Sequence, residues 1–102
     1  MSTPDPRAAA RDEVGTELKR VVRRWQQLPL DHALSASPRV REVVQRLADD
    51  VAREVGMPLT PVPDLGPAVL MDQLQVMVYD HGQAELDPVP LAAALTALRR
   101  AL

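Results

Sequence analysis

The chain has 102 residues, of which 46% are hydrophobic and 25% are charged, a composition typical of one globular domain. Its formal net charge is −2 and it has no cysteine, so disulfides, thiolate catalysis and thiolate metal sites are excluded. We expect a cytoplasmic protein, because no apolar run approaches the roughly 20 residues of a membrane span and the first residues do not resemble a signal peptide.

The first predicted helix covers residues 6–28. Asp5 followed by Pro6 is typical of an N-cap and a first-turn proline, and residues 1–5 are expected to be disordered. Gly15 is expected to weaken the helix, which could bend or fray there. Apolar residues recur every three or four positions and form one stripe, made of Val14, Leu18, Val21, Val22, Trp25 and Leu28.

The second predicted helix covers residues 38–55. Ser37 and Pro38 suggest a cap and a first-turn proline, and Gly56 suggests a left-handed C-terminal stop. Five of the six positions in its apolar stripe are valines, a poor helix former, but the period of three and four outweighs that propensity. The stripe consists of Val40, Val43, Val44, Leu47, Val51 and Val55.

Residues 57–66 form a proline-spaced connector, for which we expect an extended and semi-rigid path. Its apolar residues Leu59, Val62 and Leu65 suggest that it packs on the helices. The alternative is a proline-rich ligand for a partner domain, which is less well supported because no basic residue flanks the prolines.

The third and fourth predicted helices cover residues 67–81 and 88–101. The third is the most apolar, and we expect it to be the central, most buried helix, ended by Gly82. Asp87 and Pro88 repeat the cap and first-turn proline. The predicted buried stripes are Leu70, Leu74, Met77 and Val78 in the third helix and Leu91, Leu95, Leu98 and Leu102 in the fourth.

Together these elements predict an all-α protein, a small antiparallel bundle of four helices in a single domain spanning residues 1–102. Arg7 and Arg11 fall on the apolar side of the first helix, which favours an N-terminal overhang beyond the bundle. An overhang and a very apolar third helix both suggest a homodimer. The alternative is a monomer whose N-terminus is frayed.

No catalytic constellation stands out, and we expect neither an enzyme nor a bound cofactor. There is no Gly-x-Ser-x-Gly elbow, Ser37 is interpreted as a helix cap, and no phosphate-binding glycine motif occurs. Two acid–imidazole pairs, Asp31-His32 and Asp80-His81, could contribute to a metal-dependent hydrolase with Asp72 or Glu85. We expect no metal site, because adjacent side chains diverge and each pair supplies one ligand; whether the pairs meet depends on topology.

A basic patch on the first helix suggests nucleic-acid binding as an alternative function. Its candidate phosphate contacts are Lys19, Arg20, Arg23 and Arg24, extended by Arg7 and Arg11. Acidic residues share this helix, with Glu17 and Arg20 three positions apart, which is more typical of a self-paired, solvated face. A helix-turn-helix is disfavoured by the long connector expected between the first two helices. A nucleic-acid-associated regulator is therefore the alternative function.

The leading hypothesis is a non-enzymatic protein–protein interaction module, either a homodimer or a subunit of a larger assembly. Trp25 is the largest aromatic side chain and would anchor an interface if exposed, although a core role is the simpler reading. Asp72, Gln75 and Tyr79 recur at helical spacing on an apolar helix, with Tyr79 able to bond a neighbour or a partner. The candidate interface residues are Trp25, Met71, Asp72, Gln75 and Tyr79.

Overall fold

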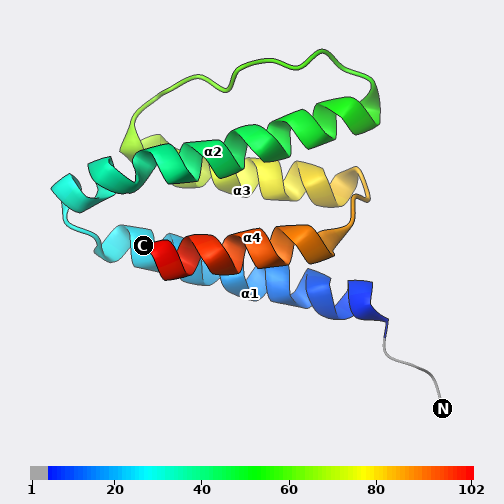
Figure 1. Ribbon diagram of the computed structural model, residues 1–102, viewed down its shortest axis with the longest axis horizontal. Helices are drawn as coiled ribbons and strands as arrows, with labels where there is room; N and C mark the ends of the chain where they lie inside the picture. The colour runs from blue at the N-terminus through cyan, green and yellow to red at the C-terminus, as the bar shows by residue number, and fades with distance from the viewer. Residues whose placement is uncertain (1–4) are drawn as a thin grey trace. The chain divides into compact units, whose positions relative to one another are not determined.

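The computed structural model describes residues 5–102, and within them the chain forms four helices and no strand (Figure 1). The helices are α1 (Pro6–Gln27), α2 (Leu30–Val55), α3 (Pro67–Gln83) and α4 (Pro88–Ala101). The all-α prediction and the number of helices are confirmed. Helix α1 packs with α4 and α2 packs with α3, and these pairs belong to two compact units, which we describe separately.

The α1/α4 pair is parallel, as both the contacts and Figure 1 show. At its beginning Arg7 Nε lies 4.0 Å from Asp87 Oδ1, and at its end Arg24 donates to the Leu102 carbonyl at 3.1 and 3.2 Å. Asp5 caps α1 by accepting from the Arg7 backbone N–H at 2.9 Å, as predicted. The expectation of disorder over residues 1–5 is therefore wrong for Asp5, and residues 1–4 lie outside the described residues. The predicted overhang is wrong, because Ala10 is already buried and Arg7 reaches the start of α4.

The core of this pair follows the predicted stripe fully in α4 and only in part in α1, because Leu18, Val22 and Leu28 of that stripe are half-buried. All four predicted leucines of α4 are buried, and the buried apolar residues of α1 are Ala10, Val14, Val21 and Trp25. Helix α1 continues through Gly15 without interruption. The aspartate that precedes α4, Asp87, accepts the N–H of Val89 at 3.0 Å, which confirms the predicted cap.

Helix α2 begins at Leu30, so the predicted start at residue 38 is wrong and only Leu28 and Pro29 separate α1 from α2. Pro38 lies inside the helix, and Ser37, predicted to be a cap, donates its hydroxyl to the Ala33 carbonyl at 2.8 Å. The reason is the apolar stripe: buried Ala33 and Ala36 extend the Val40 periodicity backwards by two turns. The long connector that disfavoured a helix-turn-helix is therefore absent.

The α2/α3 pair is also parallel, so neither packed pair has the predicted antiparallel arrangement (Figure 1). The physical cause is the connector. Gly56 ends α2 in the left-handed conformation at φ 73°, with the Met57 N–H bonded to the Ala52 carbonyl at 2.8 Å. Residues 57–66 then run extended back along the helices, and about ten extended residues reach about 33 Å. We call residues 57–66 the strap.

Helix α3 is buried on one face and exposed on the other. Five of its 17 residues are buried, against five of 14 in α4, so the expectation that α3 is the most buried helix is wrong. Leu70, Met71, Leu74 and Val78 are buried, whereas Val76 is 52% exposed. Within residues 5–102, no helix has the length and apolarity that crossing a membrane requires.

The end of α3 lies two residues beyond the prediction, because the left-handed residue is Glu85 (φ 56°) rather than Gly82. The Leu86 N–H donates to the His81 carbonyl at 3.3 Å and the Glu85 N–H to the Gly82 carbonyl at 3.1 Å, which closes the helix end.

Replacing Glu85 by glycine is therefore expected to raise the free energy of unfolding by about 0.5 to 1 kcal/mol, since a β-carbon disfavours this conformation. Glu85→Ala is the matched control, because it retains the β-carbon and should show no such gain. Urea denaturation of the three proteins measures the difference. Equal stability of the glycine and alanine variants would contradict the assignment.

Candidate functional site

A groove between α2 and α3, lined along its length by the strap, has the features of a binding site. It contains two adjoining hollows of about 310 and 450 Å³ that share Val62, Pro63 and Gln73. The larger hollow has an apolar floor, with Ala48 and Ala52 from α2 and Val76 and Met77 from α3. We call these two hollows together the α2/α3 groove.

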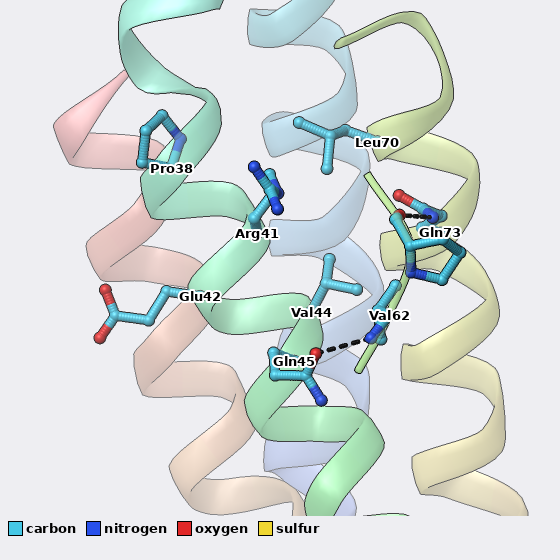
Figure 2. Close-up of a pocket in the computed structure, with 9 residues that line it drawn as sticks. Pro38, Arg41, Glu42, Val44, Gln45, Val62, Leu70 and Gln73 are labelled. Atoms are coloured by element: carbon cyan, nitrogen blue, oxygen red, sulfur yellow. Dashed lines mark hydrogen bonds between the residues drawn. The ribbon is translucent and has the colours of Figure 1, made fainter. Parts of the chain in front are cut away.

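The strap is held by polar side chains rather than by its own apolar residues. Gln45 of α2 acts like a neighbouring peptide unit: its Oε1 accepts the Val62 N–H at 2.7 Å and its Nε2 donates to the Thr60 carbonyl at 3.2 Å. On the other side, Gln73 of α3 donates to the Pro63 carbonyl at 3.0 Å. Figure 2 shows the two glutamines on either side of the strap.

A third tether is the ion pair between Arg41 and Asp64, at 2.9 Å. By contrast, Leu59 and Leu65 are 50% and 59% exposed, and only Val62 is partly buried. The expectation that all three apolar residues pack on the helices is therefore wrong for two of them. The strap is therefore attached to α2 and α3 mainly by these polar contacts.

Replacing Gln45 by alanine is expected to release the strap, because the Val62 N–H loses its acceptor and the Thr60 carbonyl its donor. We expect at least about tenfold faster hydrogen exchange at Val62 and a loss of about 1 to 2 kcal/mol in stability. Gln75→Ala is the matched control, since Gln75 bonds only the Met71 carbonyl of its own helix, at 3.1 Å. Unchanged exchange at Val62 in Gln45→Ala would show that these bonds do not hold the strap.

The structure divides the predicted interface residues into two groups. Asp72, Gln75 and Tyr79 lie on the exposed face of α3, with Tyr79 66% exposed and Asp72 lining the larger hollow. Trp25 and Met71 are buried, at 8% and 6% exposure, and lie in different helix pairs. Of the exposed members, Asp72 lines the α2/α3 groove, whereas Gln75 and Tyr79 lie on the same helix outside the lining of either hollow.

The exposed apolar residues of the α2/α3 unit were only partly predictable from the sequence. Besides Val76, which lines the larger hollow, and Tyr79 on α3, exposed apolar residues end α2 and begin the strap: Val55, Met57 and Leu59. Val55 was predicted to be core. The groove depends on the strap running back along two parallel helices, a feature of topology that local periodicity does not reveal.

The basic patch on α1 is partly used within the protein. Arg20 forms an ion pair with Glu17 at 2.9 Å, as the sequence suggested, and Arg24 bonds the Leu102 carbonyl. Lys19 and Arg23 are exposed. The structure therefore leaves two of the four candidate phosphate contacts as the more available ones.

Sequence reasoning missed a buried ion cluster in the α1/α4 pair. Glu17 is only 4% exposed, and its carboxylate receives Arg99 Nε at 2.6 Å and Arg20 Nη1 at 2.9 Å. The Arg99 hydrogen bond is the main cause that holds the pKa of Glu17 below its ordinary value; burial opposes it and Arg20 adds to it. Glu17 occupies a position on the apolar stripe, three residues after Val14, which was the available signal.

The two acid–imidazole pairs do not meet. Because α2 and α3 are parallel, Asp31-His32 at the start of α2 and Asp80-His81 near the end of α3 lie at opposite ends of the pair (Figure 1). His32 lies in the first turn of α2, whereas the predicted helix start at residue 38 left it outside the helix. Within residues 5–102 no three histidine or acidic side chains group closely enough to hold a metal ion.

Comparison of the chain with protein-family models, with curated proteins and with solved structures finds no match.

Proposed function

We propose that this chain is a non-enzymatic, cytoplasmic helical module that works by protein–protein contact through the α2/α3 groove. The observation that carries the proposal is the apolar floor of the larger hollow, which includes Val76, a side chain that is 52% exposed. Tyr79, on the same helix, is also exposed. Exposed apolar surface with a polar rim is the usual mark of a protein interaction site. The partner is either a second copy or another subunit of a larger assembly.

Affinity capture from lysate of the source organism tests this proposal. Val76→Asp places a charge in the groove, whereas Val89→Asp changes a similarly exposed valine (46%) at the start of α4. We expect one protein to be retained by the wild-type chain and Val89→Asp, with or without nuclease, and lost from Val76→Asp. Retention by Val76→Asp equal to that of the wild type would overturn the proposal.

Self-association is tested separately by light scattering over a range of concentrations. A homodimer formed through the groove should become monomeric in Val76→Asp and persist in Val89→Asp. A strict monomer at high concentration would remove the homodimer from the proposal and leave the heterotypic partner. Because α1 does not extend beyond α4, one of the two reasons for expecting a homodimer no longer holds.

The second candidate, a nucleic-acid-associated regulator, is favoured by one observation. Residues 5–27 and 87–102 carry eight basic and five acidic side chains, a formal charge of +3 in the α1/α4 pair. Because Arg20 and Arg24 have structural contacts, the sharper variant reverses Lys19 and Arg23 to glutamate. The candidate predicts salt-sensitive binding of DNA or RNA that this variant loses. Equal binding by the variant and the wild type would exclude this face.

A further inference from the structure

The chemistry of the α2/α3 groove also indicates what kind of segment it would accept, an inference that rests on the proposed function. A partner could add a strand to the extended strap or lay a helix in the apolar hollow. These two modes need different groups, because strand addition requires free backbone N–H and C=O groups along one edge, whereas a docked helix requires apolar side-chain contact.

The strap does not offer a strand edge. Its edge towards α2 is occupied, because Gln45 bonds both the Thr60 carbonyl and the Val62 N–H. The opposite edge belongs to residues 61 and 63, since alternate residues of an extended chain face opposite ways. Both are prolines without an N–H, and the Pro63 carbonyl already accepts from Gln73. Strand addition at these positions is therefore excluded, which favours a docked helix.

The negative charge around the groove favours a helix with basic residues on the two sides of its apolar face. Residues 28–86 contain four arginines and nine acidic residues, a formal charge of −5 with both histidines neutral. Asp72 lines the larger hollow and is exposed, Asp49 follows Ala48 on α2, and Asp80 follows Val76 by one helical turn. Among the ion pairs of residues 5–102, none involves these three carboxylates, and Asp49 accepts one hydrogen bond, from Gln45 Nε2 at 2.9 Å.

We propose that the α2/α3 groove binds a basic amphipathic helix of another protein, with its apolar face on Val76 and Met77 and its lysines or arginines beside Asp49, Asp72 and Asp80. A second copy of this chain does not offer such a segment in its folded state. Its strongly basic helix, α1, already packs its apolar face with α4. The charge is therefore complementary to a different protein.

Fluorescence anisotropy with the full-length chain tests the inference. The probe is a labelled peptide of about 18 residues, long enough to form a helix, with leucines on one face and lysines on the flanks. Two further peptides replace every lysine by glutamate or scramble the order of the same residues. We expect the basic amphipathic peptide to bind at least about tenfold more tightly than either, and the preference over the glutamate peptide to shrink at high salt.

Two pairs of variants locate the binding. Val76→Asp is expected to weaken binding at least about tenfold, and Val89→Asp to leave it unchanged. Asp72→Asn is expected to weaken it about threefold, while Asp12→Asn, which removes one exposed charge from α1, should have no effect. Equal weakening by both asparagine variants would show non-specific attraction to an acidic protein and overturn the inference, as would equal binding of the lysine and glutamate peptides.

The inference and the proposed function can fail independently. If capture of a natural partner depends on Val76 but the basic peptide shows no preference, the groove is an interface and the basic-helix inference is wrong. If Val76→Asp dissolves a homodimer and no peptide binds, the occupant is a second copy and the inference is again wrong. If neither capture nor peptide binding depends on Val76, both proposals fall.

Discussion

Replacing Arg99 by alanine is expected to lower the free energy of unfolding by about 2 to 3 kcal/mol, because it leaves the Glu17 carboxylate buried with one remaining partner. Glu17 is 4% exposed and cannot turn to solvent without disturbing the α1/α4 packing. Arg20 still contacts one oxygen, so the loss falls below that of a wholly unpaired buried charge. Urea or thermal denaturation measures the effect.

Replacing Glu17 itself is expected to cost less stability than replacing its partner Arg99. Glu17→Met fills a similar volume with an apolar side chain, while Arg99 and Arg20 reach water because their side chains are 30% and 55% exposed. We expect Glu17→Met to lie within about 1 kcal/mol of the wild type. Arg100→Ala, an exposed neighbour on α4, is the control and should change stability by less than about 0.5 kcal/mol. A larger loss in Glu17→Met than in Arg99→Ala would contradict this reasoning.

The same cluster predicts how stability depends on pH. The Arg99 hydrogen bond and the smaller contribution of Arg20 lower the pKa of Glu17 in the folded protein from its ordinary value of 4.5, against the opposing effect of burial. A lowered folded-state pKa contributes stability above the unfolded value, and this contribution is lost as pH falls through the folded value. The stability difference between wild type and Arg99→Ala should therefore be full near pH 7 and should narrow as the pH falls below the ordinary value of 4.5. A difference that widens in acid would contradict the assignment.

Replacing Pro38 by alanine is expected to raise the free energy of unfolding by about 1 to 2 kcal/mol. Pro38 lies in the ninth position of α2, where it has no N–H to offer the Leu34 carbonyl. Alanine is about 3 kcal/mol more favourable in a helix interior, and the greater freedom of the unfolded chain offsets part of that gain. The ring also lines the smaller hollow (Figure 2), which offsets a little more.

Whether Pro38→Ala raises or lowers stability distinguishes a helix that begins at Leu30 from one that begins at residue 38. If α2 began at residue 38, proline would suit the first turn and alanine would be neutral or destabilising. Pro6→Ala provides that comparison, because Pro6 is exposed at the first position of α1, and we expect a change of less than about 0.5 kcal/mol. A loss of stability in Pro38→Ala would contradict the helix over residues 30–37.

The helix ends were predictable wherever a local chemical signal was strong. Asp5, Gly56 and Asp87 each perform the expected capping role, because a carboxylate acceptor or a left-handed glycine acts over two or three residues. Pro38 and Gly82 misled for a related reason: packing of Ala33 and Ala36 carries α2 through a proline, and α3 continues past its glycine to end at Glu85. Small buried residues give a weak sequence signal, so the packing that overrides a helix breaker was not visible.

The candidate site was less predictable than the elements. Asp72 and Tyr79 were identified from helical spacing and do lie on the exposed face of α3, where Asp72 lines the groove. Gln45 and Gln73 carried no sequence signal, because their role arises only when the strap runs back between two parallel helices. Arg99 was missed as the partner of Glu17 for the same reason, since the pairing joins residues 82 positions apart in the chain.

Site-specific photo-cross-linking in living cells tests the central claim, that the α2/α3 groove is a protein interaction surface, most directly. A benzophenone amino acid is introduced in place of Val76, and in a second version in place of Val89. The account predicts one discrete covalent adduct between the full-length chain and a protein partner from position 76 and none from position 89. The same adduct from both positions, or no adduct from position 76, would contradict it.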